Sequence, residues 1–323
     1  MLSHFSDTFR RNKKQGPSMS RPELSVVILS FNRIEELKVN IPVIFEFSRE
    51  MGWEVIVVDN GSSDGSVEFL RAVVSGLDYV HLVTNHENLG VAGGRNVGWA
   101  KAAGCLILNI DDDAFVDLDD IRAMLEFMER NPSIGIMSPR IVHRQSLAPQ
   151  CDHGSAPVRI SNFHGACHLL RREVYSVVGE IDPSCSFGGE ELDYSLRARN
   201  AGFDVYYAPV ATAVHNNHQR AGDEGLWRRR QWVFNYTRVL SKNFPFFMAL
   251  LFSARLLASQ LFSALKLFGV LSSLSLVFSY FSGLISGFRR RSVVSRSVLD
   301  LYRNPSLRPD FGNVPLLEKI LRN

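Results

Sequence analysis

The sequence has few cysteines and little net charge, and each shortage excludes a class of protein. Of its 323 residues only four are cysteine, and these stand too far apart in the chain to form a metal-binding pair. So few thiols are typical of reduced cysteines in a cytoplasmic setting. The net charge of +3 is too small for a nucleic-acid-binding protein, so we expect no nucleic-acid partner.

The first residues also lack a feature, the apolar central region of a secretory signal peptide. Residues 1–22 are polar and basic, so we expect a flexible basic tail there. The overall composition, 46% hydrophobic and 21% charged, is ordinary for a globular protein. The length allows one large α/β domain with an appendage, or two domains.

Short apolar runs alternate with helical patterns in the first part of the chain. The runs predict buried strands at residues 24–31, 54–59, 79–85 and 105–110. Helices are expected over residues 33–50, where Asn32 can cap the start and Pro42 can introduce a kink, and over residues 117–131. This alternation predicts an α/β fold with a mostly parallel sheet covered by helices on both faces.

Polar and aromatic side chains stand where these strands end. Phe31 and Asp59 end the first two strands, and Asp111, Asp112 and Asp113 follow the fourth. In parallel sheets ligands bind beyond the carboxyl ends of the strands, so these residues should line one crevice. The three aspartates fit two interpretations, a solvated turn or a site for a cation.

The glycine-rich segment at residues 88–104 fits neither the dinucleotide-binding spacing nor the P-loop spacing. Its glycines would let the backbone approach a ligand closely, and Arg95 would offer a guanidinium to a phosphate or a carboxylate. The alternative is a glycine-rich helix start with an arginine on the surface.

At this point the chain resembles a known family. The segments "SVVILSFNR", "VVDNGSSDGS", "NLGVAGGRNVGWAKA", "LNIDDDAFV" and "GGEELDYSLRARNAGFDVYYAPVATAVH" stand in the order seen in family 2 glycosyltransferases. The resemblance covers about residues 24–243 and is strongest to bacterial rhamnosyl- and galactofuranosyl-type enzymes. It implies the GT-A fold over residues 23–243, with a nucleotide-binding half at about 23–116 and an acceptor half at about 117–243. It also implies an inverting transfer from a nucleotide sugar, assisted by Mg²⁺ or Mn²⁺.

The resemblance assigns roles on the donor side. Asp111 and Asp113 match the two ends of the family's DxD motif, so Asp113 would bind the metal and Asp111 the metal or the ribose. A hard divalent cation suits carboxylate ligands, and it would neutralise the charge that grows on the leaving diphosphate. Asp112 has a less defined place beside the donor. Around the nucleotide, the resemblance places the residues Phe31, Asp59, Asn60 and Arg95.

On the acceptor side, the resemblance points to the start of a helix over residues 190–200. The acidic residues there could simply be a charged first turn, which a helix dipole favours. The family pattern places the general base at Glu191, where the usual residue is aspartate. Glu190 is the second candidate, and Asp193 would orient the loop or the acceptor.

A histidine ends the next predicted strand. His215 matches the position that supplies a third metal ligand in some relatives, although a lone histidine is more commonly structural. His218 lies three residues later, but no further histidine or cysteine lies at a spacing suited to zinc.

Residues 244–323 differ in character because phenylalanine and leucine dominate their first part. Residues 267–288 carry no charge and are long enough to span a bilayer, and Arg289, Arg290 and Arg291 follow. Three interpretations compete: interfacial helices, an inserted hairpin, and a packing or dimerisation pair. We favour interfacial helices over residues 244–291, which predicts a peripheral protein on the cytoplasmic face of the cell membrane. An oligomer is compatible with the same region.

Taken together, the sequence predicts an inverting glycosyltransferase. Its donor would be a nucleotide sugar, with UDP or dTDP favoured, and its acceptor a cell-surface glycan or a lipid-linked glycan. A sugar-phosphate nucleotidyltransferase is the alternative enzyme, but it should carry an Arg-Lys phosphate loop after the first strand, where "SFNRIEEL" stands. A catalytically inactive sugar-binding subunit of a polysaccharide assembly is the alternative from another class.

Overall fold

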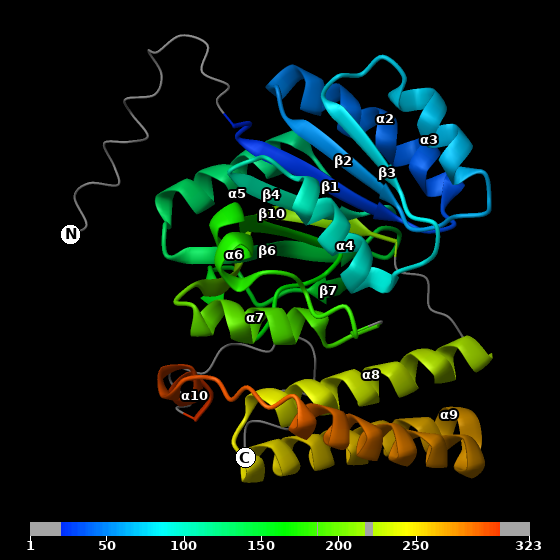
Figure 1. The fold of residues 1–323 in the computed structure, drawn as a ribbon. Coiled ribbons are helices and arrows are strands. Elements are labelled where there is room, and N and C mark those ends of the chain that lie inside the picture. Colours follow the sequence, from blue (N-terminus) through cyan, green and yellow to red (C-terminus); the bar gives the residue numbers. More distant parts are fainter. Residues whose placement is uncertain (1–20, 186, 217–221, 304–323) are drawn as a thin grey trace.

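The computed structural model describes residues 21–185, 187–216 and 222–303. In these residues ten strands form one sheet in the order β3-β2-β1-β4-β9-β6-β10-β5, with β7 and β8 paired beside β6 and β10. Helices cover both faces of the sheet, and a separate helical layer lies below it (Figure 1). The predicted N-terminal tail lies almost wholly outside the described residues, as do residues 304–323 and His218.

The first half of the sheet is parallel, as predicted. It consists of β1 (Leu24–Ser30), β2 (Glu54–Asp59), β3 (Val80–Thr84) and β4 (Leu106–Asp111). The inner strands are rich in valine, isoleucine and leucine because both of their faces are covered. The outermost strand, β3, is only partly buried.

Three helices flank this half of the sheet, namely α2 (Ile34–Met51), α3 (Ser66–Val74) and α4 (Gly90–Lys101), whereas α5 (Leu118–Arg130) packs on β6 and β10 of the other half. α4 packs against β1 and β2, where Gly98 faces Val27 and Val58. α2 contacts α5, since Arg122 reaches the sulfur of Met51 at 3.4 Å.

The predicted cap of α2 by Asn32 is wrong. Asn32 has a positive φ of 52°, and its Oδ1 accepts a hydrogen bond from the backbone N–H of Ser63 at 2.8 Å. The N–H of Ile34 donates instead to Asp64, at 3.0 Å, on the loop that follows β2. The loops after β1 and β2 therefore fix each other at the carboxyl edge of the sheet. Pro42 lies inside α2, which continues to Met51.

The second half of the sheet is mixed. β9 runs antiparallel to both β4 and β6, β6 is parallel to β10, and β5 is antiparallel to β10. Its elements are β5 (Ala114–Val116), β6 (Ile134–His143), β7 (Pro149–Cys151), β8 (Val158–Arg159), β9 (Cys167–Arg171), α6 (Arg172–Val178), α7 (Glu190–Asn200) and β10 (Asp204–His215). α4, α6 and α7 share one face, because Trp99 stacks edge-on against Tyr175 and Tyr194.

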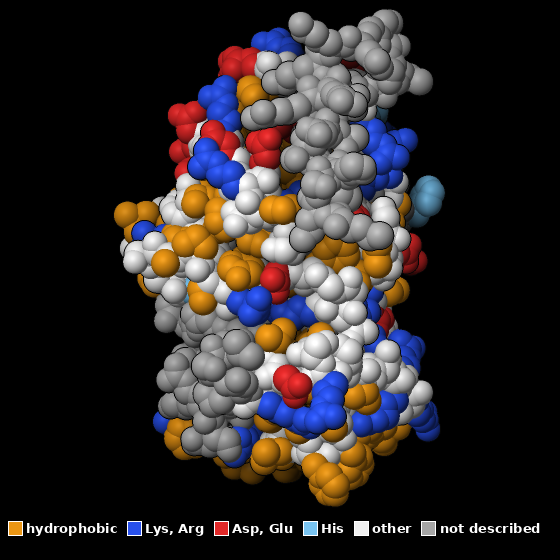
Figure 2. Space-filling model, turned by 90° about the vertical axis from the view of Figure 1, so that its left-hand side faces the viewer, with side chains coloured by type: hydrophobic (Ala, Val, Ile, Leu, Met, Phe, Trp, Pro, Cys, Tyr) orange, Lys and Arg blue, Asp and Glu red, His pale blue; other side chains and the backbone are white. Residues whose placement is uncertain are grey.

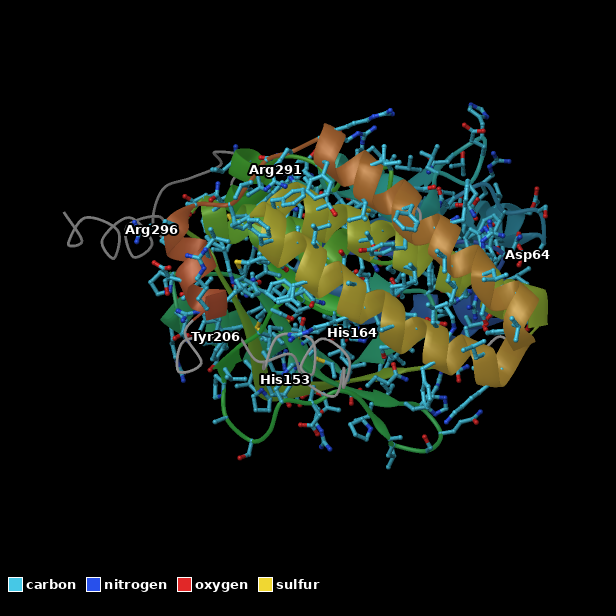
Figure 3. The ribbon with its side chains drawn as sticks, turned by 90° about the horizontal axis from the view of Figure 1, so that it is seen from below. Asp64, His153, His164, Tyr206, Arg291 and Arg296 are labelled. Carbon is cyan, nitrogen blue, oxygen red and sulfur yellow. The ribbon has the colours of Figure 1, made fainter. Side chains whose placement is uncertain are left out.

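The helical layer consists of α8 (Gly222–Asn243), α9 (Phe246–Arg289) and α10 (Arg296–Arg303). α9 breaks at Gly269, whose φ of 77° is open to glycine, and its two arms fold back on each other below α8 (Figures 1 and 3). Gly283 and Gly287 let the second arm approach the α8 backbone, since added Cβ atoms would lie 2.5 and 2.4 Å from the carbonyl oxygens of Phe234 and Arg238.

An apolar cluster joins this layer to the sheet domain. Leu192 and Leu196 of α7 pack with Phe244, with Leu256 of α9 and with Leu299 of α10. The helical layer is therefore attached to the acceptor half of the predicted domain.

The predicted bilayer-length segment at residues 267–288 is misplaced. The kink at Gly269 falls inside it, and the one helical stretch that the described residues offer as long and apolar enough to cross a membrane is Phe246–Val270. Sequence counting missed this stretch because Arg255 and Lys266 interrupt it.

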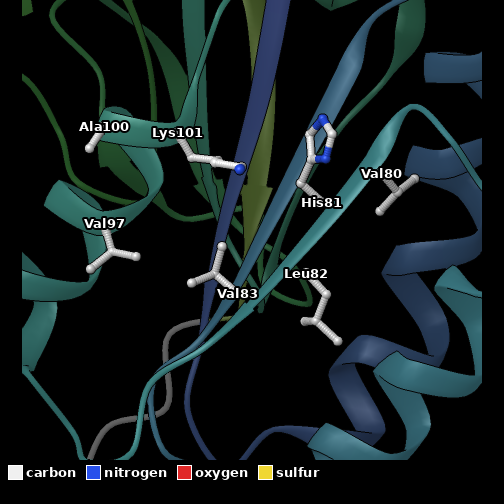
Figure 4. A pocket seen from close by; sticks show the side chains of 7 residues that line it. All are labelled: Val80, His81, Leu82, Val83, Val97, Ala100 and Lys101. Carbon is white, nitrogen blue, oxygen red and sulfur yellow. The ribbon is translucent and has the colours of Figure 1, made fainter.

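A groove of about 550 Å³ lies at the outer edge of the sheet, between β3 and α4 (Figure 4). It is lined by Val80, His81, Leu82, Val83, Val97, Ala100 and Lys101. These side chains are mainly apolar and lie on β3, at an edge of the sheet, and on α4, so we assign no chemistry to the groove.

Candidate functional site

The carboxyl ends of β1, β2 and β4 meet at one edge of the sheet, and the residues singled out from the sequence gather there. In the strand register Ser30 pairs with Asp59, and Leu29 pairs with Asp111. β10 reaches the same edge from the other half of the sheet, because His215 pairs with Ala114.

Asp59 is fully buried, and its two carboxylate oxygens differ. Oδ1 accepts hydrogen bonds from the backbone N–H groups of Gly61 and Ser62, at 3.1 and 2.9 Å. Oδ2 has no hydrogen-bond partner within the described residues. Because a buried unpaired acceptor is costly, this oxygen is suited to a donor group on a ligand, such as the N3–H of a pyrimidine base.

The neighbours of Asp59 have different roles. Phe31 is 39% exposed at the end of β1 and offers an apolar face beside Asp59. Asn60 is buried and uses its amide on the protein itself, donating to Asn88 and Gly90 and accepting from Asn85 and Leu89. The structure thus places Asn60 as a support for the loop before α4.

The three aspartates are held in three different ways. Asp111 pairs with Arg95 at 2.9 Å, while Asp113 lies 3.1 Å from His215 Nε2 and 3.4 Å from Arg33. Asp112 accepts a hydrogen bond from the Phe31 N–H at 3.4 Å, and burial, then the charge of Asp113, raises its pKa to about 8. The three aspartates do not form a solvated turn, because Asp112 and Asp113 are buried.

Asp111, Asp113 and His215 could hold a metal ion. One ligand atom from each lies within 4.8 Å of the others, and two carboxylates with an imidazole suit Mn²⁺ or Mg²⁺. Gln150 of β7 orients the imidazole: its Oε1 lies 2.6 Å from His215 Nδ1, and its Nε2 donates to the His215 carbonyl at 3.3 Å. Because Gln150 Oε1 can only accept, Nδ1 donates in this contact, and Nε2 is the ring nitrogen that faces Asp113 and would be offered to a metal.

We predict that Gln150→Leu weakens the binding of Mn²⁺ in the presence of UDP by about 10- to 100-fold, the usual effect of losing a partner that orients a ligand. Isothermal titration of UDP into protein with Mn²⁺ measures this. Gln145→Leu is the matched control, since Gln145 is exposed on the loop between β6 and β7. Equal affinities in the two variants would show that Gln150 has no such role.

Arg95 connects the two halves of the site. Its Nη2 donates to Asp111 at 2.9 Å and to the Gly165 carbonyl at 3.0 Å, and the side chain is buried. Glu191 lies against the same glycine, since an added Cβ on Gly165 would meet its Oε1 at 2.7 Å. Arg95 is therefore not on the surface, which was the alternative that the sequence left open.

Glu190 and Glu191 begin α7, as predicted, and they differ in environment. Burial raises the pKa of both carboxyls, and the charge of Arg95 acts in the opposite direction on both. After burial, the charge of Glu191 is the next cause that raises the pKa of Glu190, to about 8. Glu190 is almost fully buried and Glu191 is partly exposed, so a ligand can reach Glu191 more easily.

Asp193, the third acidic residue of this segment, points into the helical layer. Its oxygens accept from Arg197, Lys242 and Asn243 at 2.8 to 3.0 Å. Burial alone would raise the pKa of Asp193, but these partners hold it below its usual value. In the structure Asp193 ties α7 to α8.

Sequence reasoning missed three residues at this edge. Arg33 and Gln150 contact the metal-ligand candidates directly, and His164 lies with its ring centroid 6.3 Å from that of His215. Burial lowers the pKa of His164 to about 3, so its ring is neutral. Only Arg33, within "SFNR", carried a signal, because it follows a strand that ends at the site.

Comparison with known proteins points in one direction. The sequence pattern of Glycosyl transferase family 2 matches residues 25–179, and that of Glycosyl transferase family group 2 matches residues 106–289. The low-salt glycan biosynthesis hexosyltransferase Agl10 of Haloferax volcanii is 26% identical over 220 residues, 60% of this chain and 67% of that protein. The poly-beta-1,6-N-acetyl-D-glucosamine synthase of Staphylococcus aureus is 23% identical over 260 residues, 75% of this chain and 62% of that protein.

Solved structures share the fold. GalNAc-T7, solved with UDP, GalNAc and Mn²⁺, matches 74% of this chain and 51% of its own, with a TM-score of 0.59 and 16% identity. The mannosyltransferase PcManGT from Pyrobaculum calidifontis, solved with GDP-Man and Mn²⁺, matches 88% of both chains, with a TM-score of 0.55 and 18% identity. These similarities confirm the expected GT-A fold.

Proposed function

The chain belongs to glycosyltransferase family 2, and on this premise we propose that it transfers a sugar, with inversion, from a nucleotide sugar to a hydroxyl group of a cell-surface glycan or lipid-linked glycan. The family-group pattern covers more than half of the chain. The observation that supports the chemistry best is the cluster of Asp111, Asp113 and His215 beside the unpaired oxygen of Asp59. A candidate cation site and a candidate site for the nucleotide base therefore lie at the same edge of the sheet.

On the donor side, we propose a UDP- or dTDP-linked sugar of the rhamnosyl or galactofuranosyl kind. Asp59 Oδ2 would accept from the base, and Phe31 would cover one side of it. Asp111, Asp113 and His215 would hold Mg²⁺ or Mn²⁺, which when bound neutralises charge on the leaving diphosphate. Arg95 would hold Asp111 in place.

On the acceptor side, we propose Glu191 as the general base. A sugar hydroxyl attacks well only if a base removes its proton during the attack. Glu191 lies with Arg95 against Gly165 and is the more exposed of the two carboxyls, whereas burial and the charge of Glu191 raise the pKa of Glu190 to about 8. Asp193 supports this arrangement from behind by fixing α7 on α8.

A binding screen tests the donor. UDP-, dTDP- and GDP-sugars are added to the purified chain with and without Mn²⁺, and the thermal shift is measured. We expect stabilisation by UDP- or dTDP-sugars that depends on Mn²⁺. Stabilisation by GDP-sugars alone would overturn the nucleotide preference, and no stabilisation by any donor would favour an inactive subunit.

We also propose that α9 rests on a membrane surface. Its exposed residues form two apolar stripes at helical spacing, one on each arm: Phe247, Leu251, Ala254, Ala258, Phe262 and Leu265, and then Leu274, Phe278, Phe281 and Ile285. Ser253, Ser273 and Ser279 are buried inside, so the usual pattern of a water-facing helix is inverted. Figure 2 shows hydrophobic side chains gathered along the lower edge, where α9 lies, with lysine and arginine beside them.

The flat placement of both arms favours an interfacial position. Both arms lie below α8 in Figure 1, and the exposed stripe of each faces away from the protein. A helix of this kind buries one face at the boundary of head groups and acyl chains, and basic residues beside it meet anionic lipids. Arg289, Arg290 and Arg291 at the end of α9 fit that requirement.

We predict that Phe247→Ser, Phe262→Ser and Phe278→Ser together release the protein from vesicles containing anionic lipid in a flotation assay. These rings are 83%, 65% and 73% exposed, so their loss removes apolar contact without opening the core. Deleting residues 244–303 is a poorer test, because buried Phe244 packs in one cluster with Leu192 and Leu196 of α7.

The control for this variant removes exposed apolar groups from the sheet domain, with Leu147→Ser and Val177→Ser, which are 65% and 60% exposed. It should float like the unmodified protein. If the triple phenylalanine variant and this control float to the same extent, α9 is a packing or dimerisation surface. Resistance to a carbonate wash would instead identify an inserted hairpin.

A further inference from the structure

We propose that Arg33 binds the diphosphate of the donor and makes entry of the divalent cation depend on that diphosphate. Arg33 is the N-cap residue of α2, directly after β1, and its Nη2 lies 3.4 Å from Asp113 Oδ2. The proposal rests on the proposed function, because it concerns the same nucleotide-sugar site.

Each candidate metal-binding carboxylate already has a guanidinium beside it. Asp111 is paired with the buried Arg95, and Asp113 is paired with Arg33. A divalent cation that enters alone would therefore meet a fixed positive charge beside each carboxylate ligand. The Coulomb repulsion between like charges at such distances is large even at the effective dielectric constant of a protein surface.

A cation that arrives with a nucleoside diphosphate meets a different balance. The phosphate oxygens bring negative charge that offsets the charge of the cation, and the guanidinium of Arg33 can turn from Asp113 to those oxygens. Arginine suits this role because its planar fork matches phosphate oxygens and keeps its charge at every relevant pH.

The surroundings of Arg33 leave it able to change partners. Its Nη1 donates to Glu36 Oε1 at 3.1 Å, one turn along α2, which aims the side chain toward the site. The side chain is 18% exposed, so it is neither locked in the core nor free in solvent. The contact between Arg33 Nη2 and Asp113 Oδ2, at 3.4 Å, is longer than a close charge-assisted hydrogen bond, so the guanidinium can exchange it for phosphate oxygens.

The test measures Mn²⁺ binding directly, by the electron paramagnetic resonance signal of free Mn²⁺, in three series: Mn²⁺ alone, Mn²⁺ with UDP, and Mn²⁺ with inorganic pyrophosphate. In Arg33→Met we expect Mn²⁺ alone to bind about 3- to 10-fold tighter, because a repelling charge is gone. We expect Mn²⁺ with UDP to bind about 10- to 100-fold weaker, because a charge-assisted hydrogen bond to phosphate is lost.

The opposite signs of the two changes distinguish this role from a structural one. If Arg33 only anchored the loop, both affinities would fall together, and that result would overturn the proposal. Unchanged affinity with UDP and with pyrophosphate would overturn it as well. Lys38→Met is the matched control, since Lys38 lies on the same helix, pairs with Glu35 at 2.8 Å and is 46% exposed.

Failure of the proposed function would look different. If unmodified protein bound Mn²⁺ with pyrophosphate but with no nucleoside diphosphate, the nucleotide-sugar assignment would fall. Arg33 would then still be supported as a diphosphate contact by the loss of pyrophosphate binding in Arg33→Met.

Discussion

Glu191→Gln should lower the single-turnover rate of sugar transfer by about 10² to 10⁴-fold, the usual size of a general-base effect, and leave donor affinity nearly unchanged. The amide keeps the shape of the side chain and removes only its basicity. Donor affinity should survive because the candidate donor ligands lie on β1, β2, β4 and β10, whereas Glu191 lies on α7. Rapid-quench transfer measured beside donor titration separates the two quantities.

Glu190→Gln is the matched control, one residue away. Glu190 is almost fully buried and glutamine keeps its shape, so transfer should fall far less. Collapse in Glu190→Gln with near-normal turnover in Glu191→Gln would move the base by one residue.

The pH profile adds a check on the same residue. Burial raises the pKa of Glu191 above the ordinary 4.5, and a general base must be deprotonated to act. As the pH is lowered, the transfer rate should therefore begin to fall while the pH is still above 4.5.

Asp113→Ala should abolish the effect of Mn²⁺ on nucleotide binding, with a loss in affinity of about 100-fold or more. A direct ligand should matter more than a residue that only orients one, whose loss costs about 10- to 100-fold. Mg²⁺ and Mn²⁺ bind through few protein carboxylates, so losing one removes much of the site. Titration of UDP with and without Mn²⁺ measures the difference.

Asp119→Ala is the control for the loss of one negative charge, because Asp119 is 93% exposed on α5 and pairs with Arg122 on the same helix. The Asp113→Ala protein must also stay folded, which a thermal melt checks. Unchanged Mn²⁺-dependent affinity in folded Asp113→Ala protein would contradict the assignment of the metal site.

Much of the fold could be predicted from sequence because its signals are local. The buried strands β1, β2 and β4 show as runs of valine, isoleucine and leucine, and their polar ends mark one edge of a sheet. The start of α7 at Glu190 and the end of β10 at His215 were also predicted, since helix and strand patterns change there.

What could not be predicted depends on contacts between distant segments. Gln150 reaches His215 across 65 residues of sequence, and Arg33 reaches Asp113 across a comparable gap. The positions of these residues in the sequence do not reveal either contact. The same holds for Asp64, which replaces Asn32 at the start of α2 from a different loop.

The prediction for the C-terminal region was wrong for another reason. Its composition indicated apolar helices, but the break in α9 lies at Gly269 and is not visible in the composition. The serines of α9 that face the protein interior are recognised only when its two arms are placed against α8. An average over a window cannot separate an apolar outer stripe from an apolar core.

Analysis of the products formed from a panel of UDP-, dTDP- and GDP-sugars, with Mn²⁺ or with EDTA, tests metal-assisted transfer from a nucleotide sugar most directly. We expect a UDP- or dTDP-sugar to release the nucleoside diphosphate in the presence of Mn²⁺, and release to stop with EDTA. Release of pyrophosphate from a nucleoside triphosphate and a sugar phosphate would identify a nucleotidyltransferase. Donor binding without any product would contradict the assignment of an active transferase.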